Sequence, residues 1–126
     1  MTIADTDVLI DFLAGAEPGA TRVGDLVQQA SLRTTVISRF ELLAGVRSPR
    51  QEARIRSLLA AVPALPLEEA CADRAAELQR ALERSGNPIG MADCLIAGTV
   101  LVHDATLMTR NRRHFARVPG LRLLDL

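Results

Sequence analysis

Acidic side chains occupy unexpected places in this 126-residue chain, beginning at its start. In the stretch "MTIADTDVLIDFLAG", Asp5 and Asp7 stand on either side of Thr6, where one apolar run ends and another begins. Two neighbouring carboxylates repel each other beside a hydrophobic core, unless one of them caps a helix or a cation lies between them. Asp7 is suited either to cap the helix that follows or to serve a charged site, and the sequence leaves both roles open.

Two other acids lie in stretches that otherwise look buried. Glu41 belongs to "VISRFELLAGV", with Ile37 and Ala44 on its own helical face, and Asp93 belongs to "PIGMADCLIAGTV", with apolar residues at helical offsets. Both carboxylates are therefore expected to project from buried stripes. Burying an unpaired carboxylate costs several kcal/mol or forces the group to take up a proton.

A divalent cation would explain all three acids together. Oxygen ligands without histidine or cysteine are suited to Mg²⁺ or Mn²⁺ and not to zinc. Asp5, Glu41 and Asp93 are the candidate ligands on this hypothesis. His103 and His114 lack the spacing of a helical metal pair, so a structural or surface role is expected for each.

Each acid also has an ordinary explanation. Asp93 is able to start its helix after the loop "NPIGMA", and Glu41 is able to pair with an arginine such as Arg39 or Arg110. Each explanation is acceptable alone. The metal hypothesis is favoured because the ordinary explanations must all hold at once.

Short apolar runs alternate with helical periods along the chain, and these elements must position the acids. Strands are expected at residues 2–5, "LRTTVI", "ALPL", "ATLMT" and "LRLL", and helices at 7–14, 19–31, "SRFELLAGV", "SPRQEARIRSLLAAV", 68–85 and 89–101, with "RNRRHF" a loop or single helical turn. This order predicts one α/β domain over residues 1–126, a three-layer α/β/α sandwich with a mainly parallel sheet of four or five short strands. Ligands collect at the carboxyl ends of such strands, where Asp5, Thr109 and Asn111 fall.

Composition excludes several classes of function. The formal net charge is zero, so the chain does not coat nucleic acid through bulk positive charge. All fifteen basic residues are arginine, which excludes Schiff-base, phosphate-loop and general-base lysines. Cys71 and Cys94 form no disulfide framework or metal motif, and no signal peptide or long apolar run is present, so a cytoplasmic location without a membrane span is expected.

Four stretches carry a family likeness. "ADTDVLIDFL", "TTVISRFELLAGV", "NPIGMADCLIAGTVLVHDATLMTRNRRHF" and "VPGLRLLDL" resemble the PIN-domain ribonucleases, specifically the VapC toxins of toxin–antitoxin pairs. The likeness runs in order along nearly the whole chain. It implies that Asp5, Glu41 and Asp93 are the metal-binding and catalytic acids, and that the fourth polar catalytic position is Asn111, where many relatives have Asp.

The resemblance also implies the reaction, which is endonucleolytic cleavage of RNA dependent on Mg²⁺, with Mn²⁺ able to substitute. The ions would hold a water for attack on phosphorus and stabilise charge on the leaving oxygen, and Glu41 or Asp93 would accept the proton of that water. The hydroxyl groups of Thr6, Ser38 and Thr109 are expected to line the site. The neighbouring Arg110, Arg112 and Arg113 either bind substrate phosphates or are simply solvated.

The partners implied by the resemblance are RNA, a second copy of the chain in a homodimer, and a small antitoxin that folds a tail over the cleft. Two other functions remain open. The neutral Asn111 favours a PIN-like binding module without activity. A haloacid-dehalogenase-type phosphatase also begins with Asp-x-Asp after a strand, but its chemistry uses a lysine that this chain lacks.

Overall fold

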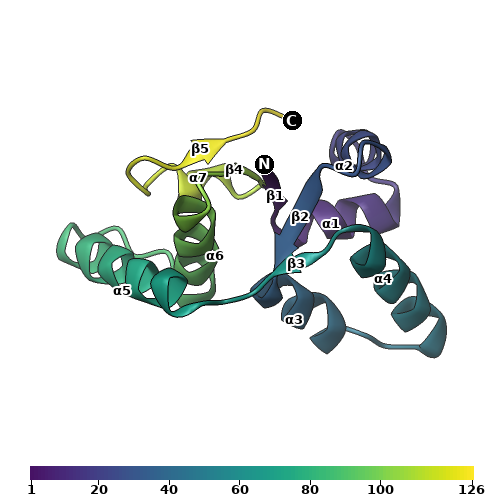
Figure 1. Cartoon of the computed structure of the whole chain (residues 1–126), viewed down its shortest axis with the longest axis horizontal. Helices are drawn as coiled ribbons and strands as arrows, with labels where there is room; N and C mark the ends of the chain where they lie inside the picture. The colour runs from purple at the N-terminus through teal and green to yellow at the C-terminus, as the bar shows by residue number, and fades with distance from the viewer.

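The computed structural model describes all residues 1–126 and contains seven helices and five strands (Figure 1). In chain order these are β1 (Thr2–Ala4), α1 (Thr6–Ala14), α2 (Gly19–Gln28), β2 (Leu32–Thr35), α3 (Val36–Ala44), α4 (Pro49–Ala61), β3 (Ala64–Leu65), α5 (Glu69–Arg84), α6 (Met91–Val102), β4 (Thr106–Met108), α7 (Arg112–Phe115) and β5 (Arg122–Leu123). Strands therefore alternate with helices, as the hydrophobic pattern predicts.

The five strands form one sheet with the order β3-β2-β1-β4-β5, and every neighbouring pair is parallel. The central strand β1 places Thr2 opposite Leu32 of β2 on one side and opposite Thr106 of β4 on the other. Because all strands run the same way, their carboxyl ends meet at one edge of the sheet. Residues that follow β1 and β4 are therefore neighbours, although about a hundred positions separate them in the chain.

Alternation of side chains along the strands builds a core on each face of the sheet. Ile3 and Leu107 belong to a core with residues of α5 and α6, whereas Ala4 and Met108 belong to a second core with residues of α1, α2 and α4. Figure 1 shows α5 and α6 on one side of the strands and α1, α2 and α4 on the other. This arrangement confirms the predicted three-layer α/β/α sandwich with a parallel sheet.

Several predicted boundaries are wrong by a few residues. The strand predicted over "LRTTVI" ends at Thr35, because the Thr35 hydroxyl accepts a hydrogen bond from the Ser38 amide at 3.1 Å and starts α3. Val36 and Ile37 are consequently the first residues of a helix and not the end of a strand. The stretch "RNRRHF", predicted as a loop or a single helical turn, contains the helical turn α7, in agreement with the second alternative, and its Phe115 is completely buried.

The helices of the structure are too short or too polar to cross a membrane. Cys71 and Cys94 are both buried and form no disulfide. Each packs inside the protein as a small apolar side chain.

Close packing of α5 against α6 depends on Gly98. A Cβ atom at this position would lie 2.8 Å from the carbonyl oxygen of Cys71 and 2.9 Å from the backbone nitrogen of Ala75. Gly98→Ala is therefore expected to destabilise the protein by about 1–3 kcal/mol in urea unfolding, because backbone atoms of α5 cannot move aside cheaply. Gly24→Ala in α2 is the matched control, since its Cβ would meet only Phe12 at 3.6 Å and is expected to add about 0.5–1 kcal/mol. Equal stability of the two variants would contradict this account.

Candidate active site

Asp5 lies where β1 ends and α1 begins, and the residue is only 6% exposed. Its Oδ1 accepts a hydrogen bond from the backbone N–H of Thr6 at 2.8 Å, and its Oδ2 accepts one from the Thr109 hydroxyl at 2.8 Å. Asp5 is thus the N-cap residue of α1, and the alternative that Asp7 caps this helix is wrong. The cap is Asp5 because the helix already begins at Thr6.

Burial raises the pKa of Asp5 from 3.8 to about 7, and the nearby charges of Asp7 and, more weakly, Asp93 act in the same direction. Burial also raises the pKa of Asp7. Its Oδ2 accepts a hydrogen bond from the backbone N–H of Arg110 at 3.0 Å, whereas its Oδ1 is buried and has no hydrogen-bond partner. A buried carboxylate oxygen that lacks a donor and lies near a second buried carboxylate is a place where a cation is favourable.

Glu41 lies on α3 and is exposed, so the prediction that it projects from a buried stripe is wrong. The helix buries only Ser38 and Leu42, because just one narrow side of it packs on the protein. Oε1 of Glu41 accepts a hydrogen bond from the Thr6 hydroxyl at 2.7 Å, and the hydroxyl oxygens of Thr6 and Ser38 are 2.9 Å apart. The carboxylate therefore turns toward the end of β1.

Arg110 does not pair with Glu41. Its Nε lies 2.6 Å from Oδ2 of Asp11, a buried acid on α1. Sequence reasoning missed Asp11, and its spacing of four residues from Asp7 is the signal that would have placed both acids on one face of the helix. The loop after β4 is consequently tied to α1 through the Arg110 side chain and, at its backbone, through Asp7.

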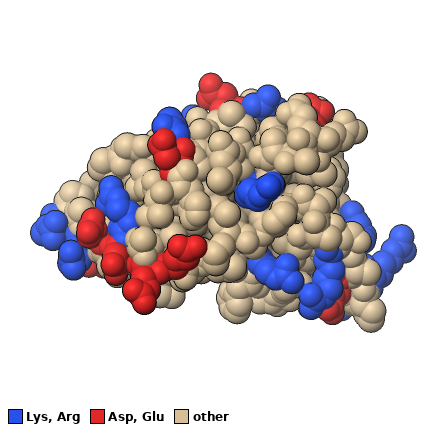
Figure 2. Space-filling view, viewed as in Figure 1, with Lys and Arg blue, Asp and Glu red and all other residues tan.

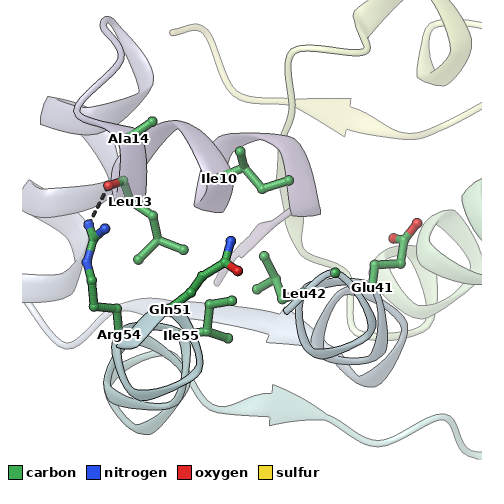
Figure 3. Close-up of a pocket in the computed structure, with 9 residues that line it drawn as sticks. Ile10, Leu13, Ala14, Glu41, Leu42, Gln51, Arg54 and Ile55 are labelled. Carbon is green, nitrogen blue, oxygen red and sulfur yellow. Dashed lines mark hydrogen bonds between the residues drawn. The ribbon is translucent and has the colours of Figure 1, made fainter. Parts of the chain in front are cut away.

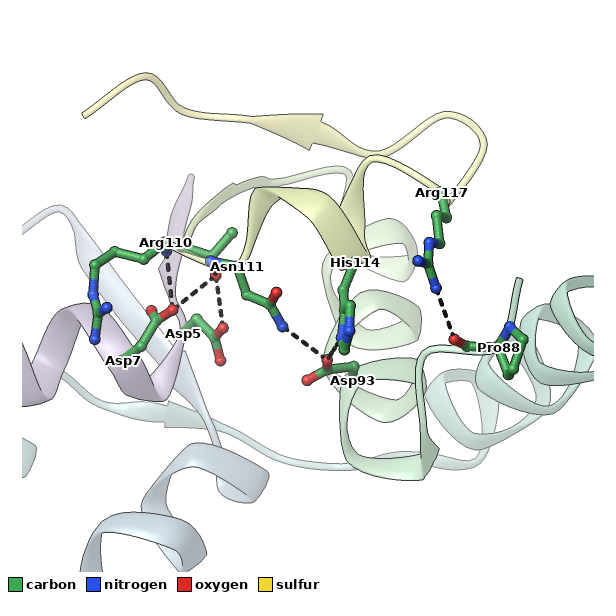
Figure 4. A network of polar contacts seen from close by, with 9 residues as sticks. Asp5, Asp7, Pro88, Asp93, Arg110, Asn111, His114 and Arg117 are labelled. Carbon is green, nitrogen blue, oxygen red and sulfur yellow. Dashed lines mark hydrogen bonds and ion pairs between the residues drawn. The ribbon is translucent and has the colours of Figure 1, made fainter. Parts of the chain in front are cut away.

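Asp93 lies in the first turn of α6 and is half-buried. Its Oδ2 lies 3.3 Å from Nδ2 of Asn111 and 3.0 Å from Nδ1 of His114 (Figure 4). The neutral Asn111 thus donates a hydrogen bond to an acid instead of adding a fourth carboxylate. Sequence reasoning assigned His114 a structural or surface role and missed this contact, although His114 lies about one helical turn beyond Asn111.

One polar network connects the predicted site residues across four elements of the fold. Beginning at α3, it runs through Glu41, Thr6, Asp5, Thr109, Asn111, Asp93 and His114, with Ser38 beside Thr6. Arg110 joins it through the Asp7 carboxylate. Arg112 lies outside it, because its guanidinium contacts the carbonyl of Leu124 at 3.0 Å and Asp125 at 3.4 Å.

The donor set fits a hard divalent cation. Asp5, Glu41 and Asp93 supply carboxylate oxygens from three separate elements, and the unpartnered Oδ1 of Asp7 adds another. No three histidine, cysteine, aspartate or glutamate side chains form a complete ligand cluster in the present arrangement. The assignment of these acids as metal ligands therefore stays a prediction.

An apolar groove adjoins the network at Glu41. It lies between α1, α3 and α4 and has a volume of about 310 Å³ (Figure 3). Its lining residues are Ile10, Leu13, Ala14, Glu41, Leu42, Gly45, Gln51, Arg54 and Ile55. Its walls are mainly apolar and carry one arginine, Arg54, and one acid, Glu41. Figure 2 shows basic side chains over the end of the molecule where Figure 1 places α4.

The structure combines a parallel sheet with acidic side chains at the carboxyl ends of its strands. The chain belongs to the PIN domain family, whose sequence pattern it matches over residues 2–121. The predicted family resemblance is thereby confirmed, and the dehalogenase-type alternative has no support. The chain is 36% identical to Ribonuclease VapC10 of Mycobacterium tuberculosis over 91% of this chain and 86% of that protein.

Two further comparisons agree. Ribonuclease VapC19 of Mycobacterium tuberculosis is 34% identical, with 96% of this chain and 97% of that protein covered. The structure of VapBC-1 from nontypeable Haemophilus influenzae superimposes with a TM-score of 0.81 and 25% identity, covering 98% of this chain and 96% of that chain. The likeness therefore extends over the whole fold.

Proposed function

We propose that this protein is an endoribonuclease of the VapC type and the toxin of a toxin–antitoxin pair. The observation that carries the proposal is the single polar network that links Asp5, Glu41 and Asp93 through Thr6, Thr109 and Asn111. The relatives named Ribonuclease VapC10 and Ribonuclease VapC19 support the same activity.

The cofactor we propose is Mg²⁺, with Mn²⁺ able to substitute, held by Asp5, Glu41 and Asp93. Two observations support a cation here: the buried Oδ1 of Asp7 has no hydrogen-bond donor, and the pKa of Asp5 is raised, mainly by burial and further by the charges of Asp7 and Asp93. When bound, such an ion polarises the phosphoryl oxygen and lowers the pKa of a coordinated water.

The protein groups around the acids hold their oxygens in place. Thr109 orients Asp5, and Thr6 orients Glu41, each through a hydroxyl hydrogen bond. Oε2 of Glu41 receives no hydrogen bond from the chain, so it is free to accept a proton from an attacking water. Arg113 is exposed and is the arginine of this segment that we propose to contact substrate phosphates, because Arg110 pairs with Asp11 and Arg112 with Asp125.

The partners we propose are RNA, a small antitoxin and a second copy of the chain. The apolar groove of α1, α3 and α4 is suited to an antitoxin segment, because it ends at Glu41 and so leads a bound chain toward the acids. Phe40 and Met91 are 69% and 70% exposed, and each lies within two residues of a site acid. Such large apolar side chains are suited to contact between two copies.

One observation favours a second candidate, a PIN-like binding module without activity. Asn111 is neutral where many relatives of this family have Asp, and its side chain donates to Asp93 instead of offering an additional carboxylate. A protein of this kind would bind its partner and leave RNA intact.

The two candidates are separated by incubating purified, antitoxin-free protein with structured RNAs and Mn²⁺, beside the Asp5→Ala variant. We expect cleavage by the wild type and none by the variant. Sequencing of RNA 5′ ends after induced expression of each would then identify the sites that are cut. Intact RNA in every sample, or equal cleavage by both proteins, would overturn the proposed nuclease.

A further inference from the structure

His114 contacts one of the proposed metal-binding acids directly. Its Nδ1 lies 3.0 Å from Oδ2 of Asp93, and Nδ2 of Asn111 lies 3.3 Å from the same oxygen. A carboxylate oxygen only accepts hydrogen bonds, so Nδ1 of His114 carries the hydrogen and donates it. Two nitrogen donors from the segment after β4 therefore hold one oxygen of Asp93.

The other oxygen of Asp93, Oδ1, receives no hydrogen bond from the chain. In Figure 4 the His114 ring approaches Asp93 from α7, and the Asn111 side chain reaches the same oxygen from between Asp5 and Asp93. The two acids are close enough for the charge of Asp93 to raise the pKa of Asp5. Fixing Oδ2 consequently leaves Oδ1 without a protein partner and available to a cation.

The position of His114 is set by the fold and not by chance contact at the surface. It belongs to the turn α7, and the next residue, Phe115, is completely buried in the core shared with α6. The His114 side chain is 40% exposed and Asp93 is 21% exposed, so water competes only partly for their hydrogen bond. Donors to a ligating carboxylate orient it, and losing such a donor commonly weakens metal binding ten- to a hundredfold.

We propose that His114 is a positioning residue: it holds Oδ2 of Asp93 so that Oδ1 is presented to the divalent cation beside Asp5. This inference rests on the proposed metal-dependent function. It assigns the histidine a role through Asp93, without contact between His114 and the substrate.

Calorimetric titration of the full chain with Mn²⁺ tests the proposal in three variants. His114→Phe keeps a ring but removes the donor, and His114→Asn restores an N–H near the position of Nδ1. His103→Phe is the matched control. Nδ1 of His103 contacts the Thr99 carbonyl at 2.9 Å at the C-terminal end of α6, whereas Asp93 lies in the first turn of that helix. His114→Ala replaces the Phe variant if the latter does not fold.

We expect His114→Phe to weaken Mn²⁺ binding about ten- to a hundredfold, with most of the affinity recovered in His114→Asn and none lost in His103→Phe. Thermal midpoints measured in EDTA should be similar for the His114 variants and the wild type. Two results overturn the positioning role while leaving the nuclease proposal intact. In the first, His114→Phe binds Mn²⁺ with wild-type affinity. In the second, His114→Asn loses as much Mn²⁺ affinity as His114→Phe. Failure of the wild type itself to bind Mn²⁺ overturns the metal proposal and this inference together.

Discussion

Replacing Asp5 with asparagine is expected to abolish RNA cleavage and, at the same time, to make the cation-free protein more stable at pH 7. Cleavage falls because the variant loses one of the three proposed ligand carboxylates. A loss of about 10²- to 10⁴-fold is typical of removing a group that takes part directly in the chemistry. The opposite sign of the two effects distinguishes a functional acid from a structural one.

The gain in stability follows from the pKa of Asp5, which burial raises from 3.8 to about 7. Below pH 4 the carboxyl is protonated in both the folded and the unfolded chain, so its contribution to the stability of the folded state is fully present. Between about pH 4 and pH 7 only the folded chain retains the proton, so stability falls as pH rises, by up to about 4 kcal/mol. Asparagine carries no charge, and its amide is able to accept from the Thr6 N–H and donate to the Thr109 hydroxyl.

Urea unfolding in EDTA between pH 4.5 and pH 8 measures this effect. Wild-type stability should decrease across the range, and Asp5→Asn should show a much flatter profile. Asp73→Asn on the exposed face of α5 is the control and should follow the wild type. A variant that is less stable than the wild type at pH 7, or that still cleaves RNA at the wild-type rate, would contradict the assignment of Asp5.

Divalent cations are expected to stabilise the protein much more at pH 8 than at pH 5.5. The cation and the proton compete for the Asp5 carboxyl, whose pKa is about 7. At pH 8 and a hundredfold excess of Mg²⁺ over its dissociation constant, we expect a gain of about 2.7 kcal/mol and an increase of several degrees in Tm. At pH 5.5 about one carboxyl in thirty is ionised, so the same concentration should add only about 1 kcal/mol.

Thermal melts with and without Mg²⁺ at the two pH values check this expectation. Asp93→Asn should lose most of the Mg²⁺ response, whereas Asp73→Asn should retain it. Equal increases in Tm at both pH values would show that the cation binds away from Asp5. An unchanged response in Asp93→Asn would remove Asp93 from the proposed ligand set.

Hydrophobic periodicity determined most of the fold from the sequence alone. Helical and alternating patterns act over a few residues, so they identify the strands, the core helices and the order that produces a parallel sheet. The same pattern places Asp5 and Thr109 at the ends of their strands. The start of α3 at Val36 was predicted two residues too late, because a single hydroxyl cap at Thr35, and not periodicity, ends the strand there.

Tertiary structure alone decided which side chains of the site contact one another. The exposure of Glu41 depends on how little of α3 is covered, which no local pattern contains. The bonds of Asp5 to Thr109 and of Asp7 to Arg110 join residues more than a hundred positions apart. The contact of His114 with Asp93 depends likewise on α7 packing beside α6. Side chains pair with the groups that lie near them in the folded chain. The sequence therefore determines which chemical groups are present, and the packing of the layers determines which of them are neighbours.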